Sequence, residues 1–185
     1  MADETDKSRV LAAATELFNE RGVQAVGMDA IRDAAGIPLK RLYSYFPSKA
    51  ALISAVLKQR DRATQQAMAN FVEQRTDDPR ERILAVFDYL GSWFAETDFR
   101  GCMFINSVGE LGGTSPEVRR IARANKVALR DYLADLVAAA GLPSAYADEL
   151  AILANGAIVA ATIYGDGPEA AGSARHAATT ILASA

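Results

Sequence analysis

The chain has 185 residues, half of them hydrophobic, which is enough to bury a core in one modest domain or two small ones. Its formal net charge of −3 excludes a polybasic protein, so any nucleic-acid site must be a local patch. The single cysteine, Cys102, excludes an internal disulfide framework and a cysteine-based zinc site. A polar N-terminus and the lack of a long uninterrupted apolar run predict a cytoplasmic protein with no signal peptide and no membrane span.

Apolar residues recur at helical spacing along the chain, and glycine or proline separates the segments. We expect helices over residues 6–20, 28–35 and 38–45, with Pro38 as the first helical residue of the third. A long fourth helix is expected from the N-cap Ser48 to Phe71, followed by a linker over 74–80. The later helices are expected over residues 83–94, 102–111, 116–140, 144–164 with Ser144 as its cap, and from Pro168 onward. The pattern predicts an all-α fold of about nine helices.

Residues 27–49 have the pattern of a helix-turn-helix. Two short helices flank Gly36, which permits a tight and left-handed turn between them. Small apolar faces that let the helices cross closely are expected at Ile31, Ala34, Ala35, Ile37 and Leu42. The outer surface of the second helix is expected to carry Leu39, Lys40, Arg41, Ser44 and Tyr45. Such a helix can enter the major groove while cations and hydroxyls hold phosphates.

Charge is distributed unevenly along the chain. Residues 28–62 hold seven cations and three acids, a net charge of +4, so the remainder must carry about −7. A chain in which one region binds DNA and the other region does not would show this asymmetry of charge. A solvated basic face on an ordinary helical bundle would show it too, so charge alone leaves both interpretations open.

Four short motifs in the first 60 or so residues occur in a fixed order and resemble the N-terminal signature of the TetR family. They are Phe18 to Gly22, Ala35-Gly36-Ile37, Leu42-Tyr43-Ser44-Tyr45-Phe46 and Ser48-Lys49. The resemblance implies a TetR-like all-α fold, with a helix-turn-helix DNA-binding domain over residues 1–48 and a ligand-binding and dimerisation domain over 49–185. It also implies a homodimeric, ligand-responsive repressor of a palindromic operator.

The same resemblance implies which residues contact double-stranded operator DNA. Tyr43 and Lys49 match the positions of the family's phosphate contacts, and Asp29 lies where some members reach a base. The base-reading and backbone-reading surface of the family corresponds here to Pro38, Leu39, Lys40, Arg41 and Ser44.

Three positions depart from the family pattern. Val26-Gly27 stands where many members place a Thr or Ser cap, and glycine offers no hydroxyl. Pro38 replaces the family's turn serine, and Arg32 replaces a small residue of the second helix. These departures leave the expected fold unchanged, but they affect which residues are expected to contact DNA.

The C-terminal half carries polar side chains within apolar helical stripes. Asn125 falls on one such stripe, and Asn106 and Ser107 lie in the apolar run from Cys102 to Val108. Buried polar groups need partners, and an aromatic cavity with a few polar groups is the usual form of a small-molecule site. Candidates for binding a largely apolar effector are Trp93, Phe94, Phe104, Asn106, Asn125 and Tyr132. Alternatively, these aromatic residues are plain core, and the asparagines bond to backbone.

Alanine and glycine dominate residues 144–183, which include the only histidine, His176. Small residues let helix axes approach closely, and in TetR-like proteins the last two helices pair with those of a second subunit. We therefore expect a homodimer through residues 144–183, with His176 at the interface or the surface. Charged substitutions at Ala157 or Ala161 are expected to shift the protein toward monomer.

Three other functions are open to the sequence. An enzyme is disfavoured because the chain has one Cys, one His and no phosphate-binding glycine motif, so we expect no catalytic residue, no metal and no cofactor. A helical adaptor that binds only proteins would fail to shift any DNA. An activator, or a repressor that needs no ligand, would share the same fold.

Overall fold

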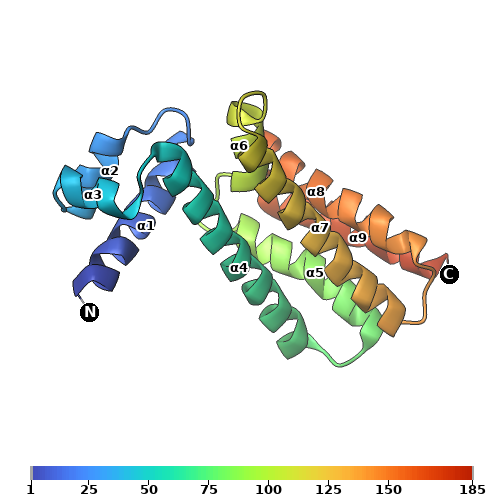
Figure 1. Ribbon diagram of the computed structural model, residues 1–185. Helices are drawn as coiled ribbons and strands as arrows, with labels where there is room; N and C mark the ends of the chain where they lie inside the picture. The colour runs from blue at the N-terminus through green and yellow to red at the C-terminus, as the bar shows by residue number, and fades with distance from the viewer. Residues whose placement is uncertain (1, 185) are drawn as a thin grey trace. The chain divides into compact units, whose positions relative to one another are not determined.

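A computed structural model describes residues 2–184, which form nine α-helices and no strand (Figure 1). The helices are α1 (Ala2–Arg21), α2 (Met28–Ala35), α3 (Leu39–Tyr45), α4 (Lys49–Arg75), α5 (Pro79–Phe94), α6 (Met103–Leu111), α7 (Pro116–Ala139), α8 (Ala145–Tyr164) and α9 (Gly167–Ala183). The all-α expectation of about nine helices is confirmed. The bounds of α2 agree with the sequence prediction, and most other helix ends differ from it by one to four residues.

Helix caps explain some of the differences in helix bounds. The Asp78 carboxylate accepts hydrogen bonds from the amides of Arg80 and Glu81, so α5 begins at Pro79 rather than at residue 83. Pro38 is the N-cap of α3 and not its first helical residue. Ser48 caps α4 as expected, because its Oγ accepts from the Ala51 amide at 3.1 Å. Ser144 makes no side-chain cap bond, which corrects the expectation for α8.

The described chain divides into two compact units. The first unit comprises residues 1–62 and 103–123, and therefore holds α1 to α3, the start of α4, α6 and the start of α7. The second comprises residues 63–102 and 124–185, with the end of α4, α5, the end of α7, α8 and α9. These units are defined by packing. The predicted boundary at residue 48, between a DNA-binding domain and a ligand-binding domain, is defined by function and stays a prediction.

The helix-turn-helix of the first unit is held by a small apolar core. Ile31, Leu42 and Val10 are fully buried, and Ala35 and Ile37 are nearly so. Gly36 has φ 63° and ψ 40°, the left-handed turn that the sequence predicts, and its amide donates to the Arg32 and Asp33 carbonyls. Ala34 is exposed, so its expected place in the crossing face is wrong.

In the second unit, α9 packs against both α5 and α8. Phe87 and Ile83 of α5, Leu150 and Ala154 of α8, and Ala178 of α9 are almost inaccessible to solvent. By length and composition alone α8 could cross a membrane, with a mean hydropathy of 1.3 and 39% of the apolar window buried. Core helices of globular proteins commonly have this composition, so the finding is weak as a sign of a membrane span.

Candidate nucleic-acid interface and effector site

The solvent face of α3 carries the predicted DNA-reading side chains. Lys40, Arg41, Tyr43 and Ser44 are exposed, while Leu39 and Tyr45 are half-buried. On the opposite face Leu42 is fully buried and anchors the helix to the core of the first unit. The helix therefore presents cations and hydroxyls to solvent from a fixed support, which is the arrangement that groove binding requires.

Arg41 is held in place before any ligand arrives. Its Nε lies 2.9 Å from Oδ2 of Asp6 on α1 and donates to the Tyr45 hydroxyl at 2.9 Å. The Ser44 hydroxyl donates to the Arg41 carbonyl at 2.6 Å. A phosphate or base that binds this guanidinium must therefore compete with the Asp6 carboxylate.

The two remaining candidates near α3 differ in how firmly they are held. Asp29, at the start of α2, is exposed and forms an ion pair with Arg32 at 3.1 Å. Arg32 also contacts Asp33 at 2.7 Å, and chiefly through Asp33 its pKa is raised. Pro38 is exposed at the N-cap of α3. The departure from the family pattern at Arg32 thus acts directly on Asp29, because Arg32 forms an ion pair with its carboxylate as well as with Asp33.

Lys49 opens α4 and lies half-buried beside the connection between α1 and α2. Its ammonium donates to the Gln24 carbonyl at 2.8 Å. Burial lowers the pKa of Lys49, and the negative charge of Glu110 opposes that shift. The predicted phosphate contact therefore also fastens the start of α4 to the loop between α1 and α2.

Glu110 of α6 completes this junction inside the first unit. Its carboxylate accepts from the amide of Gln24 at 2.7 Å and from that of Val23 at 3.3 Å. Gly22 has φ 82°, and a Cβ there would lie 2.7 Å from Glu110 Oε1, so the turn leaves room for the carboxylate. Sequence analysis missed Glu110, because an acid at the end of a short helix gives no signal of a partner almost ninety residues away.

The predicted effector residues divide between the two units, Phe104 and Asn106 lying in the first and the other four in the second. In the second unit the Trp93 ring lies 5.7 Å from the tilted Phe94 ring and makes an edge-to-face contact with Phe99 at 5.1 Å, measured between ring centroids. Phe99 was missed by sequence analysis, because it follows α5 outside any helical stripe. The cluster therefore brings two of the predicted residues together with one unpredicted aromatic ring.

The predicted polar effector residues differ in how deeply they are buried. Asn125 is buried, as its place on an apolar stripe predicts. Asn106 is exposed, which corrects the expectation that it lies inside an apolar face, whereas its neighbour Ser107 is fully buried and its Oγ has no hydrogen-bond partner. Tyr132 is half-buried, and burial raises its pKa, with Glu73 adding to the shift and Arg82 opposing it.

Two hollows with volumes suited to small molecules are lined by other residues. One of about 450 Å³ lies in the second unit among α4, α5 and α9, and one of about 410 Å³ lies in the first unit beside Lys49. The latter is lined by Val23, Gln24, Lys49, Ala50, Ala51, Ile53, Ser54, Leu111, Ser115, Glu117 and Val118. Ligand binding by the six predicted residues stays a prediction.

The two sides of α8 differ in burial and in residue size. Ala157 and Ala161 are buried within the single chain, so a charge there would disturb its own core rather than report on dimerisation alone. The exposed side of α8 instead carries large apolar residues, with Ile152 74% and Ile163 71% exposed. His176 is exposed on α9, in agreement with the sequence prediction.

Comparison with known proteins gives consistent matches along the chain. Residues 10–56 match the family model of bacterial regulatory proteins of the tetR family. The transcriptional activator FasR of Mycolicibacterium smegmatis is 31% identical over 131 residues, which are 71% of this chain and 58% of FasR. The chain thus spans less than two thirds of the length of this curated relative.

Solved structures match over almost the whole chain. A TetR-family transcriptional regulator from Streptomyces coelicolor superposes with a TM-score of 0.89 at 27% identity, covering 98% of this chain and 96% of the other. A TetR-type regulator from Streptomyces avermitilis is 30% identical and superposes with a TM-score of 0.76, covering 94% of this chain and 98% of the other. The similarity therefore extends well beyond the helix-turn-helix.

Proposed function

Because this chain belongs to the TetR family of bacterial transcriptional regulators, we propose that it binds operator DNA and acts as a ligand-responsive, homodimeric repressor. The observation that carries the proposal is the solvent face of α3, where Lys40, Arg41, Tyr43 and Ser44 are exposed above a buried anchor. A local basic surface in an acidic protein matches the chemistry of a phosphate backbone.

The roles of the surface residues differ. Lys49 and Tyr43 hold phosphates, which fix the position of the protein without reading sequence. Lys40, Arg41 and Leu39 face base edges, with Ser44, Pro38 and Asp29 at the margin of the same surface. Arg41 exchanges the Asp6 carboxylate for a DNA acceptor on binding, so part of its charge is compensated in the free protein.

DNA binding is tested by selecting an operator from random duplex DNA and then titrating it at several salt concentrations. Lys49→Met and Tyr43→Phe are expected to weaken binding to every sequence, and Lys49→Met to reduce the salt slope by about 1. Lys40→Ala is expected to change the preferred sequence. Arg80→Gln, an exposed cation of the second unit, is the matched control. An operator bound equally by the parent and all three variants would contradict the assigned surface.

Dimerisation is proposed to use the exposed stripe of α8. Ile152, Gly156, Val159 and Ile163 follow one another at intervals of four, three and four residues, so they share one helix face. This face is exposed, which a stable monomer would leave as an apolar patch in water. Two copies joined there would offer two copies of α3 to the half-sites of a roughly palindromic operator.

An apolar effector is proposed to bind in the second unit near Trp93, with Phe94, Asn125 and Tyr132 as candidate contacts. It releases DNA only if it binds better to a conformation that no longer fits the operator. Such coupling is typically about 1–3 kcal/mol, which is a 5–150-fold change in operator affinity. Ligands found by Trp93 fluorescence are therefore titrated against the selected operator, and a class of bound ligands that leaves its affinity unchanged would contradict ligand control.

Repression is the proposed sign of regulation, because a dimer seated on promoter DNA excludes polymerase from the same site. In vitro transcription from a template carrying the selected operator is expected to fall as protein is added and to recover with the effector. A rise in transcript would instead assign an activator, as the name of FasR states for that relative.

A further inference from the structure

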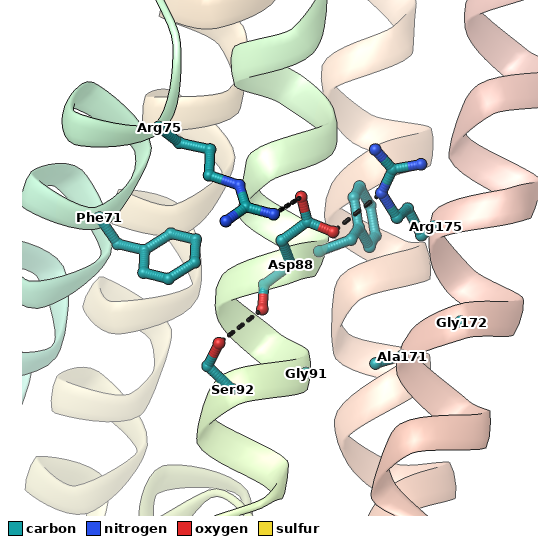
Figure 2. A pocket seen from close by; sticks show the side chains of 9 residues that line it. Phe71, Arg75, Asp88, Gly91, Ser92, Ala171, Gly172 and Arg175 are labelled. Carbon is teal, nitrogen blue, oxygen red and sulfur yellow. Dashed lines mark hydrogen bonds and ion pairs between the residues drawn. The ribbon is translucent and has the colours of Figure 1, made fainter.

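A groove in the second unit lies among the end of α4, the middle of α5 and α9 (Figure 2). Its volume of about 450 Å³ is within the range of small-molecule sites. The groove is lined by Phe71, Arg75, Phe87, Asp88, Gly91, Ser92, Ala171, Gly172 and Arg175. None of these residues belongs to the predicted effector set, so the groove is a separate candidate site.

Small residues form the part of the groove that α5 and α9 share. A Cβ added at Gly91 would lie 3.2 Å from the Cβ of Ala171, so the two helices approach closely there. Gly172 is exposed, and a Cβ at this position would meet no atom within 4 Å. The Phe71 ring extends from α4 on the other side of the groove. An aromatic wall opposite a flat surface of small residues suits a planar, apolar ligand body.

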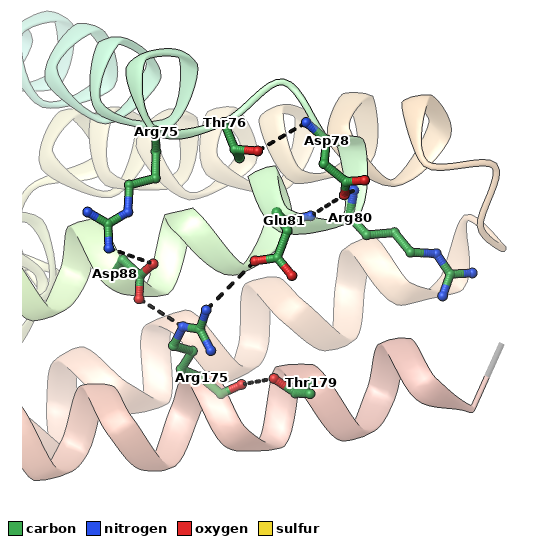
Figure 3. Close-up of polar contacts among 8 residues, drawn as sticks. All are labelled: Arg75, Thr76, Asp78, Arg80, Glu81, Asp88, Arg175 and Thr179. Atoms are coloured by element: carbon green, nitrogen blue, oxygen red, sulfur yellow. Dashed lines mark hydrogen bonds and ion pairs between the residues drawn. The ribbon is translucent and has the colours of Figure 1, made fainter.

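Two guanidinium groups meet a single carboxylate at one end of the groove (Figure 3). Arg175 Nε donates to Asp88 Oδ1 at 2.8 Å, and Arg175 Nη2 lies 3.9 Å from Glu81. Arg75 Nη2 lies 3.8 Å from the other Asp88 oxygen, and its guanidinium lies 5.9 Å from the Phe71 ring centroid. Arg175 therefore compensates the charge of Asp88 at short range, whereas the ion pair of Arg75 is long.

The two side chains of the Arg75–Asp88 ion pair differ in their exposure to solvent. The Arg75 side chain is 60% exposed, and that of Asp88 is 23% exposed. Arg75 can thus turn toward a ligand without leaving Asp88 unpaired, because the bond from Arg175 stays in place. A guanidinium binds a carboxylate through two parallel hydrogen bonds, which gives it a geometric preference for this group.

We propose that this groove binds a flat aromatic monocarboxylate, with its carboxylate on Arg75 and its ring between Phe71 and the small residues Gly91, Ala171 and Gly172. A cation is disfavoured because Asp88 already has two arginine partners. A polyanion is disfavoured because Asp88 and Glu81 lie at the same end and only Arg75 is loosely paired. The inference goes beyond the proposed DNA-binding function, and its test contains no DNA.

The probe is 2-naphthoate, with the uncharged 2-naphthamide as its matched control, and binding is measured by calorimetry on the full chain. We expect saturable binding of one naphthoate per chain, and binding of the amide that is about tenfold weaker or more. Arg75→Gln is expected to weaken naphthoate binding by about tenfold or more. Arg119→Gln, an exposed arginine of α7 outside the groove, is expected to bind like the parent.

A second variant tests shape independently of charge. Gly172→Leu fills the open space while keeping both arginines, and leucine favours a helix, so folding is retained and naphthoate binding is expected to be lost. Circular dichroism and thermal unfolding verify that each variant is folded. The proposal is overturned if the parent fails to bind naphthoate at millimolar concentration, if the amide binds as tightly, or if folded Arg75→Gln and Gly172→Leu both bind like the parent.

Discussion

The exposed faces of α3 and α8 belong to different units and differ in chemistry. On α3 the exposed residues include Lys40 and Arg41, and the exposed aromatic ring of Tyr43 carries a hydroxyl. On α8 the exposed stripe contains Ile152, Val159 and Ile163 with no charged residue among them. The face of α3 therefore suits a charged, hydrated partner, and the face of α8 suits an apolar partner surface that excludes water.

Salt separates the two kinds of surface experimentally. Binding through phosphate contacts releases counterions, so it weakens steeply as salt concentration rises. Association through apolar area is much less sensitive, and salts such as sulfate strengthen it. The same buffer series should thus weaken operator binding and leave self-association intact.

The largest expected effect is that of a charge on the α8 stripe. Ile152→Glu places an unpaired carboxylate in the proposed dimer interface, which is expected to weaken self-association by about a hundredfold. Sedimentation velocity measures this change, and operator affinity is expected to fall with it while binding of a single half-site is retained. Ala138→Glu, at an exposed position of α7, is the control. A parent chain that is monomeric at micromolar concentration would refute the interface itself.

A smaller effect is expected from loss of the Glu110 carboxylate. Glu110→Ala leaves the amides of Val23 and Gln24 without this acceptor, which is expected to lower the free energy of unfolding by about 1–3 kcal/mol. Urea denaturation measures the loss, and hydrogen exchange at the two amides should become faster. Glu16→Ala, an exposed acid on α1, is the control. Unchanged exchange at Val23 and Gln24 would show that the carboxylate does not hold this turn.

The Asp6 carboxylate restrains Arg41 on the proposed DNA-binding surface. Asp6→Asn removes the charge that pairs with Arg41 at 2.9 Å, so binding to nonspecific DNA is expected to rise by about fivefold at most. Selectivity for the operator is expected to fall, because the guanidinium is less restrained. Fluorescence anisotropy with operator and scrambled duplexes measures both effects, and Glu16→Gln serves as the comparison. Reduced nonspecific binding would contradict this role of Asp6.

The smallest effect concerns an exposed ion pair. Arg120, bonded to Glu117 at 2.7 Å, lowers the pKa of Glu117 from its ordinary 4.5 to about 2. The ionised pair stabilises the folded chain above pH 4.5, and this contribution is lost as the pH falls from 4.5 toward 2. Glu117→Gln should therefore lose less stability than the parent between pH 5 and about pH 2.5, as urea midpoints at both pH values will show. Equal acid sensitivity in the two proteins would count against the ion pair.

Local interactions made much of the helix-turn-helix predictable. Gly36, the buried Ile31 and Leu42, and the exposed Lys40 lie within one short segment, where spacing and turn chemistry decide the structure. The missed start of α5 has a local cause as well, because the Asp78 carboxylate begins this helix four residues early. An acid just before a proline, such as Asp78 before Pro79, is a pattern from which a helix cap can be predicted.

Features that depend on distant packing could not be predicted. Ala157 and Ile152 both lie on α8, yet one is buried and the other 74% exposed, because α9 and α5 cover only one side. The contact of Glu110 with Gln24, and the approach of Arg75 and Arg175 to Asp88, join residues far apart in sequence. Periodicity identifies an apolar face, whereas the partner of that face is set by tertiary structure.

The unbroken course of α4 has a geometric consequence. Its 27 residues contain neither glycine nor proline and extend over roughly 40 Å, so the helix has no built-in hinge. A rod of that length turns a small rotation into a large displacement. Pivoting by about 5° at the Arg75 end carries the Lys49 end through roughly 3.5 Å, about the rise of one DNA base pair. A reorientation too slight to repack a core can therefore displace Lys49 by several ångströms, on the order of 3.5 Å.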